Sequence, residues 1–402
     1  MRQSRTFILL GVATAVVVAA AILTRPKPST VSQNGGSLFP DLSAKINDTA
    51  AVEVSSAGEK FTLERKDKRW VVSAKSGYPA AVNEVRKLLL GMAQLRRLEP
   101  KTSNPKLYDK LELGDPSAKG GTSVQYTVEG AGKQPLASLV IGKRRPANGN
   151  SSASELFVRV PGDPQTWLVV GNVPVHKTAR EWLDKVLLKI KPGRVRRVTV
   201  THSGGEEVRV EKKAPGEADF ELQNIPEGRE LDSKYMVNSV ARTFADLSLD
   251  DVQPASGVDF DKSPGVTAVL ETFDGLRVTM RTRKDGDKTL ARLAASFDPA
   301  LVAAPAAASG DKTVPGAGKA GTAEAAKSDE AAKGKPAAAG PASASKEKTK
   351  EAKPRDVARE AELLNARWKG WVYEVPDYQM DDLSKKMENL TKVEKADAGK
   401  GS

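Results

Sequence analysis

The same succession of strand, turn and helix patterns occurs twice in this 402-residue chain. Residues 52–54 and 61–66 alternate between apolar and polar side chains on either side of a glycine turn, and residues 198–200 and 208–212 do the same. Such alternation predicts two β-hairpins. An internal repeat constrains the fold strongly, because both copies are expected to form the same structure.

The pattern continues in the same order beyond the two hairpins. Short strand-like segments at 69–72 and 219–222 precede residues 82–89 and 237–244, whose apolar side chains recur at helical spacing. We expect further strands at 124–128, 136–141 and 156–161 in the first half and at 267–272, 276–283 and 371–376 in the second, with closing helices at 181–188 and 380–390. The sequence therefore predicts an α+β protein of two tandem homologous halves, each an antiparallel β-sheet with packed helices.

The second half contains a long segment that has no counterpart of that length in the first. Residues 299–353 consist mainly of Ala, Gly, Lys, Pro and Ser, and the aromatic strand 371–376 follows them. We match this strand with 156–161, which makes the segment an insertion in the loop before it. Such a composition buries too little apolar surface to become ordered, so we expect a disordered insert. Surface loops lengthen at small cost, about 0.6 kcal/mol of closure free energy per doubling.

An uncharged run from Phe7 to Leu23 follows Arg2 and Arg5 at the N-terminus. As a helix this run would span about 26 Å, the short end of a membrane-crossing segment. A cleaved signal peptide is the alternative, since the small residues 19–21 offer a cleavage site, but its apolar core would be unusually long. We therefore expect a single-pass anchor in the cytoplasmic (inner) membrane, with the main body on the periplasmic, extracytoplasmic side.

These patterns define a domain plan for the chain. It comprises an anchor at 1–24, a linker at 25–45, a first α+β repeat at 46–192, a second α+β repeat at 193–298 and 354–392, and the insert at 299–353.

The charge and the missing cysteines exclude several classes of function. The formal net charge is +12, which by itself is typical of proteins that bind nucleic acid or anionic surfaces. An extracytoplasmic body does not meet chromosomal DNA, so we expect no nucleic-acid partner and retain an anionic envelope polymer. The chain has no cysteine, which excludes disulfides and thiolate metal sites.

The sequence contains no convincing catalytic motif. The Ser-x-x-Lys spacing at 103–106 and 345–348 lacks the companion motifs of penicillin-binding enzymes, and the glycine pattern at 316–321 lies in the insert without a strand before it. The two histidines, His176 and His202, lie near turns in different halves with no carboxylate cluster beside them. We therefore expect no catalytic residue, no cofactor and no metal site.

The aromatic residues of the predicted strands and helices are expected to pack in the core. Trp70, Trp182, Trp371 and Tyr373 fall on inward faces of their elements. Trp368 falls on the face opposite to Trp371, at the start of the predicted strand. An exposed tryptophan is a typical interface residue, so Trp368 is the one candidate partner contact.

Several short motifs stand out along the chain. They are Trp70, Tyr78-Pro79-Ala80, Leu113-Gly114-Asp115-Pro116, Leu139-Val140-Ile141-Gly142 and Glu181-Trp182-Leu183-Asp184-Lys185. With these motifs the chain resembles a bacterial family known only as a domain of unknown function, over about residues 50–290 and 366–390. The motifs are turns, a helix start and core tryptophans, so no catalytic residue is carried over from the family.

This resemblance implies a function in a membrane complex. Members of the family are membrane-anchored, extracytoplasmic, and typically encoded beside ABC transporters of the gliding-motility type and their auxiliary components. The resemblance implies a non-enzymatic accessory or scaffold subunit of an ABC-type export complex, with the transporter's membrane and auxiliary subunits as partners. The alternative is an envelope-polymer (cell-wall glycan) binding protein, which the basic charge favours. The third alternative is an enzyme, whose active site would need polar side chains that converge from both halves of the chain.

Deletion of the insert tests this organisation. Replacing residues 305–350 by a short Gly/Ser linker should leave the melting temperature within a few degrees of the parent chain, because the flanking segments belong to the predicted fold. Limited proteolysis of the parent chain should cut first within the same residues. A large fall in melting temperature on deletion would show that the segment packs.

Overall fold

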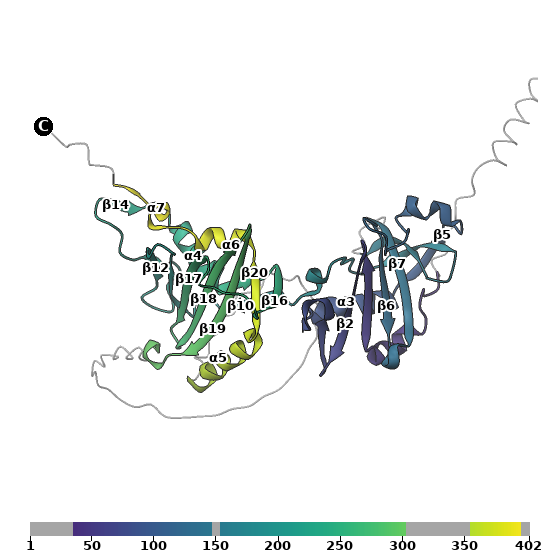
Figure 1. The fold of residues 1–402 in the computed structure, drawn as a ribbon, viewed down its shortest axis with the longest axis horizontal. Coiled ribbons are helices and arrows are strands. Elements are labelled where there is room, and N and C mark those ends of the chain that lie inside the picture. Colours follow the sequence, from purple (N-terminus) through teal and green to yellow (C-terminus); the bar gives the residue numbers. More distant parts are fainter. Residues whose placement is uncertain (1–34, 147–152, 303–353, 395–402) are drawn as a thin grey trace, which may run out of the picture. The chain divides into compact units, whose positions relative to one another are not determined.

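The computed structural model describes residues 35–146, 153–302 and 354–394 (Figure 1). They divide into two compact units. Unit 1 contains the described residues up to Lys185 together with Asp251–Gln253, and unit 2 contains Val186–Asp250 and the described residues from Pro254 onward. The expected membrane anchor at 1–24 lies outside the described residues. Among those described, no helix combines the length and apolar character needed to cross a membrane.

Unit 1 is built on a nine-stranded sheet, and every strand pair in it is antiparallel. Its strands are β1 (Ala51–Ser56), β2 (Glu59–Lys66), β3 (Arg69–Val72), β4 (Tyr78–Pro79), β5 (Arg96–Pro100), β6 (Val124–Glu129), β7 (Pro135–Pro146), β8 (Ser154–Arg159) and β9 (Thr166–Gly171). They lie in the order β4-β3-β2-β1-β6-β7-β8-β9-β5. Alternate residues such as Val52, Val54 and Leu63 are fully buried, as period-two alternation predicts.

The second sheet has eight strands and belongs to unit 2 apart from residues 251–253 of its edge strand. Its strands are β11 (Val195–Thr201), β12 (Glu207–Glu211), β13 (Glu221–Leu222), β16 (Asp251–Pro254), β17 (Pro264–Thr272), β18 (Leu276–Asp285), β19 (Lys288–Phe297) and β20 (Trp371–Val375). They lie in the order β13-β12-β11-β17-β18-β19-β20-β16. Two short antiparallel pairs accompany this sheet: β10 (Val186–Lys189) with β15 (Asp246–Ser248), and β14 (Arg229–Leu231) with β21 (Thr391–Val393).

The chain follows the same path through both sheets. In each, the first strands run in order from the centre to one edge, β1–β4 in the first sheet and β11–β13 in the second, and a later strand, β5 or β16, takes the opposite edge. The last four strands, β6–β9 or β17–β20, then run from the centre to meet that edge strand. A twelve-residue helix stands between the two sets of strands in each case, α3 (Val82–Ala93) or α4 (Lys234–Ala245). The α+β class is therefore confirmed.

Both helices form where apolar residues recur at helical spacing. Val85, Leu88 and Met92 of α3 are fully buried, and α4 buries Val237, Val240 and Phe244 on its own sheet. The side chain of Ser233 caps α4 by accepting a hydrogen bond from the Tyr235 amide at 3.2 Å. The remaining α-helices of the described residues are α2 (Leu42–Lys45), α5 (Pro354–Trp368), α6 (Asp377–Leu383) and α7 (Met387–Leu390).

The prediction of a linker at 25–45 is wrong for residues 35–45. Residues 35–45 pack on unit 1, where Leu38 and Leu42 are 4% and 2% exposed. The Leu38 amide donates to the Leu95 carbonyl at 2.8 Å, and Ser37 forms a β-bridge with Arg96. The apolar side chains of this segment place it in the core, so the first unit begins before residue 46.

The junction between the two units also differs from the expectation. The predicted helix 181–188 is instead a short 3-10 helix, Ala179–Trp182, followed by extended chain and β10. Leu183 forms a β-bridge with Ala80, which keeps the chain extended there. Because β10 pairs with β15, the second unit begins at Val186 and not at 193. The predicted closing helix 380–390 is divided between α6 and α7.

The predicted correspondence between the strand at 371–376 and the strand at 156–161 is wrong as well. Strand β19, which the sequence analysis did not recognise, occupies the position of β8 (residues 156–161 in the prediction). The aromatic strand β20 therefore corresponds to β9, and the chain between β19 and β20 replaces the short β8–β9 connection. Residues 299–302 belong to the fold, with Leu301 only 8% exposed, and 354–368 form α5. Residues 303–353, the remainder of the predicted insert, lie outside the described residues.

An arginine at the start of β11 fastens α5 to the sheet. Arg194 donates to both carboxylate oxygens of Asp274, at 2.8 and 3.3 Å, in the turn between β17 and β18. It also donates to both carboxylate oxygens of Glu360 on α5, at 3.1 and 2.8 Å. Burial by itself would lower the pKa of Arg194, but these hydrogen bonds outweigh it and raise the pKa.

Replacing this arginine should therefore destabilise unit 2. Arg194→Met should reduce the free energy of unfolding by about 2–4 kcal/mol, because two partly buried carboxylates lose their shared cation. Urea unfolding monitored by tryptophan fluorescence measures this change. Arg281→Met is the matched control, since Arg281 pairs with the exposed Asp261, and its loss should stay below about 1 kcal/mol. Equal losses in the two variants would contradict the assignment.

Candidate functional site

Strand β19 is covered partly by a strand and partly by a helix. Its pairing with β20 joins Thr289–Ala291 to Tyr373–Val375. Beyond this register the side chain of Asn365 on α5 accepts from the Ala295 amide at 2.8 Å and donates to the Ala295 carbonyl at 2.7 Å. The amide of Asn365 thus satisfies the backbone groups that a neighbouring strand would otherwise pair.

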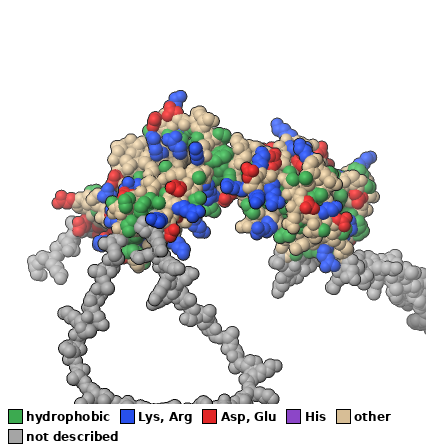
Figure 2. Space-filling view, turned by 90° about the horizontal axis from the view of Figure 1, so that it is seen from below, with side chains coloured by type: hydrophobic (Ala, Val, Ile, Leu, Met, Phe, Trp, Pro, Cys, Tyr) green, Lys and Arg blue, Asp and Glu red, His purple; other side chains and the backbone are tan. Residues whose placement is uncertain are grey.

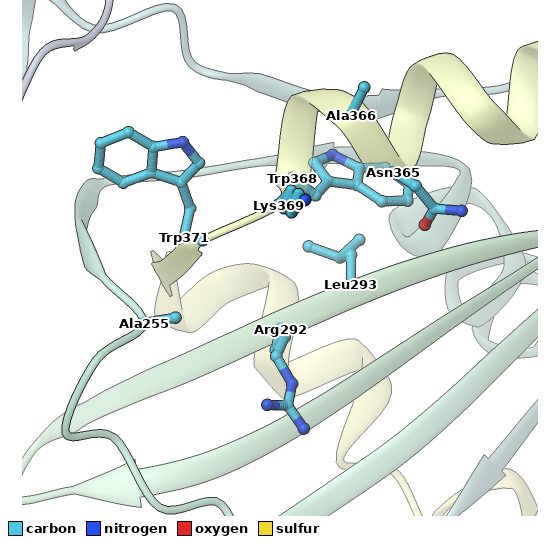
Figure 3. A pocket seen from close by; sticks show the side chains of 9 residues that line it. Ala255, Arg292, Leu293, Asn365, Ala366, Trp368, Lys369 and Trp371 are labelled. Carbon is cyan, nitrogen blue, oxygen red and sulfur yellow. The ribbon is translucent and has the colours of Figure 1, made fainter.

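A pocket of about 430 Å³ lies where α5 ends and β20 begins (Figure 3). Its walls come from the end of α5, the first residue of β20, the middle of β19 and the chain after β16. The lining residues are Ala255, Arg292, Leu293, Asn365, Ala366, Trp368, Lys369, Gly370 and Trp371.

The pocket is lined mainly by apolar and aromatic groups. Figure 3 shows the indoles of Trp371 and Trp368 on the two sides of the space beside Leu293, while Arg292 extends away from both indoles. Trp371 is half-buried, and Lys369 at the rim is exposed. Neither a carboxylate nor a histidine is among the lining residues. This arrangement suits the binding of an apolar or aromatic group next to an anionic one.

Trp368 is not the exposed residue that the sequence predicted. It lies in the last turn of α5 and not on a strand, and it is only 3% exposed. Its Nε1 donates to the Leu187 carbonyl of β10 at 3.3 Å. The neighbouring Arg367 donates to the Val186 carbonyl of the same strand. Trp368 therefore fastens α5 to β10, and the exposure that the sequence predicts for it is wrong; its indole is accessible only as part of the pocket wall.

The sequence feature that points to this pocket is the helical pattern of α5, and not the strand pattern of β20. Residues 354–368 are rich in Ala, Glu, Leu and Arg, and a proline opens the segment. Gly370 follows at φ +83°, a left-handed conformation that favours glycine after a helix. These start and stop signals were sufficient to predict α5, which the sequence analysis did not include, and α5 places Trp371 beside the open part of β19.

Three side chains from other parts of unit 1 contact His176. Its Nε2 lies 3.2 Å from a carboxylate oxygen of Glu84 on α3, and its ring packs edge-on against Trp182, with centroids 4.9 Å apart. The Tyr126 hydroxyl accepts from the His176 amide at 2.8 Å and donates to its carbonyl at 2.9 Å. No carboxylate cluster stands beside His176 in the sequence, but α3 brings one carboxylate, Glu84, to it from 92 residues away.

Glu181 locks the loop that carries His176. Its Oε2 accepts from the amides of Lys177 and Thr178, both at 2.8 Å, and from the Thr178 hydroxyl at 2.9 Å. Burial by itself would raise the pKa of Glu181, but these hydrogen bonds to the ionised form outweigh it and lower the pKa. The cluster holds the loop against Trp182, which is fully buried.

The other candidates are scattered. His202 in unit 2 lies 3.2 Å from the Lys385 carbonyl through its Nε2. Ser103 and Lys106 are both exposed, at the start of the 3-10 helix Pro105–Leu111. The motifs at 316–321 and 345–348 lie outside the described residues. Within the described ranges, no group of three or more His, Asp or Glu side chains is arranged to hold a metal ion.

Removing the charge of Glu181 should weaken unit 1 in a pH-dependent way. Because the folded-state pKa is lowered, the carboxylate stabilises the fold above its ordinary value of 4.5, and this contribution is lost as the pH falls through the folded pKa. Glu181→Gln should therefore cost about 1 kcal/mol near pH 7 and less near pH 3. Urea unfolding at both pH values measures the difference.

The exposed residue Glu59 supplies the control for this measurement. Glu59→Gln should leave the free energy of unfolding unchanged within about 0.5 kcal/mol at both pH values. If the loss in Glu181→Gln were as large at pH 3 as at pH 7, the ionised carboxylate would not be its source.

Comparison with known proteins identifies a family but not an activity. The family described as "Domain of unknown function (DUF4340)" matches residues 70–294, more than half of the chain and parts of both units. No curated protein and no solved structure shows significant similarity to the chain. The match covers both central helices, α3 and α4, and strands of both sheets up to β19. The chain belongs to the DUF4340 family.

Proposed function

We propose that this protein is a non-enzymatic accessory subunit of an ABC-type membrane export complex. The apolar run at 7–23 anchors it in the cytoplasmic membrane, and its two units lie on the extracytoplasmic side. The run has the length and flanking arginines of a membrane anchor. The resemblance to membrane-anchored proteins encoded beside gliding-motility-type transporters supports the same assignment, as an association and not as a mechanism.

The observation that carries this proposal is the pocket around Trp371. A concave site of this size, with aromatic and apolar walls, is suited to receive a large side chain of a protein partner. The lining offers Trp371 for contact and Lys369 for an acidic group of the partner. These groups bind and orient a ligand, but they supply neither a nucleophile nor a general acid–base pair.

We further infer that the two units descend from one duplicated ancestor. Their shared strand path and the matching positions of α3 and α4 support this inference. In the described residues, the helix that forms the wall of the pocket occurs in unit 2. In unit 1, β8 and β9 pair along their full length, from Ser154↔Gly171 to Arg159↔Thr166, and no helix replaces the partner strand. The second copy would thus have gained α5 and a binding function at the freed part of β19.

The second candidate function is the binding of an anionic envelope polymer such as cell-wall glycan. The charge of +12 favours it, and an indole beside a lysine is a suitable platform for an anionic sugar. Figure 2 shows basic side chains spread among acidic ones over the visible face of both units, without a single continuous basic stripe. A distributed charge of this kind gives weak, salt-sensitive attraction and less specificity than the pocket.

Site-specific crosslinking in intact cells tests the proposal. A photoreactive phenylalanine derivative in place of Trp371 should form a covalent adduct with a membrane subunit of an exporter, identified by mass spectrometry. The same derivative in place of Tyr378, an aromatic residue of unit 2 that is 67% exposed, is the matched control and should give at least tenfold less adduct. Adducts with glycan alone would support the polymer-binding function instead. Equal protein adducts from both positions would reject the pocket as the docking site.

A further inference from the structure

A buried lysine in unit 2 lacks an ordinary ion-pair partner. Lys212, directly after β12, is only 2% exposed. Its Nζ donates a long hydrogen bond of 3.4 Å to the Pro192 carbonyl and lies 4.3 Å from the centre of the Phe220 ring. No carboxylate of the described residues lies within ion-pair distance of it. Lysines are rarely buried to this extent without a paired charge, so the position needs an explanation.

The corresponding position in unit 1 shows that the fold does not require this burial. Strand β2 carries Arg65 there, and the Arg65 amide donates to the Ala50 carbonyl as the Lys212 amide donates to the Arg196 carbonyl. The Arg65 side chain reaches the Asn47 carbonyl at 3.5 Å, in parallel with the bond from Lys212 to Pro192. Arg65 is nevertheless exposed. Unit 2 has therefore covered a cation that unit 1 leaves in water.

Phe220 provides the cover, and α4 holds it in place. Asn238 of α4, which is 5% exposed, accepts from the Phe220 amide at 2.9 Å and donates to Asp219 at 2.9 Å. This pair of bonds fixes the loop before β13. The Phe220 ring is thereby kept over the ammonium group of Lys212, which gains a cation–π contact.

The same residues form one wall of a pocket of about 260 Å³. The pocket lies between the chain after β10, the Phe220 loop and the last turn of α4. Its interior is apolar, and Lys189, Arg242 and Asp246 supply its charged groups. The complete lining is Lys189, Ile190, Pro192, Val195, Phe220, Ala241, Arg242, Ala245 and Asp246. Both residues that touch the Lys212 ammonium group, Pro192 and Phe220, belong to this wall.

The charges around the pocket are predominantly positive. Arg242 is exposed at the mouth and forms no ion pair within the described residues, and Lys189 is exposed beside it. Burial lowers the pKa of Lys212, and the nearby charge of Arg242 lowers it further, while Asp219 and Glu217 act in the opposite sense. Among the lining residues, Lys189 stands opposite Asp246 in the β10–β15 pair, so the net lining charge of +1 is carried by Arg242. A single uncompensated cation beside an apolar cavity attracts an anionic group.

We propose that this pocket binds a single acyl chain that carries an anionic group. The chain lies against Ile190, Val195 and Ala241, and its carboxylate or phosphate meets Arg242 and Lys189 at the mouth. Lys212, behind the Phe220 wall, adds a longer-range attraction to the anion. The volume lies slightly below the range of about 300–1,000 Å³ for small-molecule sites, which favours one short chain over a complete lipid.

Labelling with a photoreactive decanoate tests the site in the full chain, held in phosphatidylcholine nanodiscs without free detergent. The photoreactive group at the chain end should label peptides that contain residues 189–195 or 241–246. Excess decanoate should suppress the labelling, and decyltrimethylammonium, with the same chain length and the opposite charge, should not. Arg242→Gln should reduce labelling about tenfold through the loss of one charge-assisted hydrogen bond.

Three further variants separate binding from folding. Ala241→Leu fills the cavity and should abolish labelling while the melting temperature is kept or raised. Lys212→Met should reduce labelling severalfold, whereas Lys213→Met should leave it unchanged, since Lys213 is exposed and pairs with Glu221. Labelling that survives both Arg242→Gln and Ala241→Leu, or that the cationic analogue suppresses equally, would overturn the proposal.

The source of the ligand is resolved by a change of the nanodisc lipid. If phosphatidylglycerol in place of phosphatidylcholine suppresses the labelling in the parent chain, the occupant is an anionic membrane lipid that inserts one chain. If the labelling persists, a free single-chain acid is the occupant. Both results support the shared chemistry of an acyl chain with an anionic group.

Discussion

The interaction between Arg194 and its two carboxylates holds the second unit together around its helix. Arg194 joins the start of β11, the β17–β18 turn and α5, three segments that are far apart in the sequence. From this fixed position α5 presents Asn365 to β19 and Trp368 to β10. The pocket at Trp371 exists because the helix stands where a strand would otherwise complete the sheet. Both proposed binding surfaces of the protein lie in this unit.

Two cations of unit 2, Arg194 and Lys212, differ in how their charges are compensated. Arg194 is surrounded by carboxylates and makes bidentate bonds, so its charge is satisfied and its role is structural. Lys212 is more deeply buried, yet it has only a carbonyl at 3.4 Å and an aromatic ring. A charge in such surroundings retains the capacity to stabilise an added anion. The surroundings of Lys212, and not the Arg194 cluster, therefore suit an anionic ligand.

Much of the fold follows from local sequence patterns, and the errors have specific causes. The hairpins at 52–66 and 198–212 and the helices at 82–89 and 237–244 formed as predicted, because alternation and helical spacing report directly which face is buried. The helix expected at 181–188 failed because the bridge between Leu183 and Ala80 requires extended chain. The sequence patterns do not predict strand β19, so they match β20 with the wrong strand of unit 1. Trp368 was assigned to a strand because α5 was not recognised.

The sequence alone determined the α+β class, the two successive sets of hairpin and helix, and the family of the chain. These depend on short-range periodicity, which a linear pattern records. Only the tertiary structure decided that Glu84 meets His176, that Asn365 completes β19, and that Phe220 covers Lys212. The first two of these contacts join residues 92 and 70 positions apart, and the third depends on the packing of the Phe220 loop on α4. A basic residue at the matching position is exposed in unit 1, as Arg65, and buried in unit 2, as Lys212. Sequence periodicity fixes which faces are apolar, but the packing of those faces decides which charges lose their water.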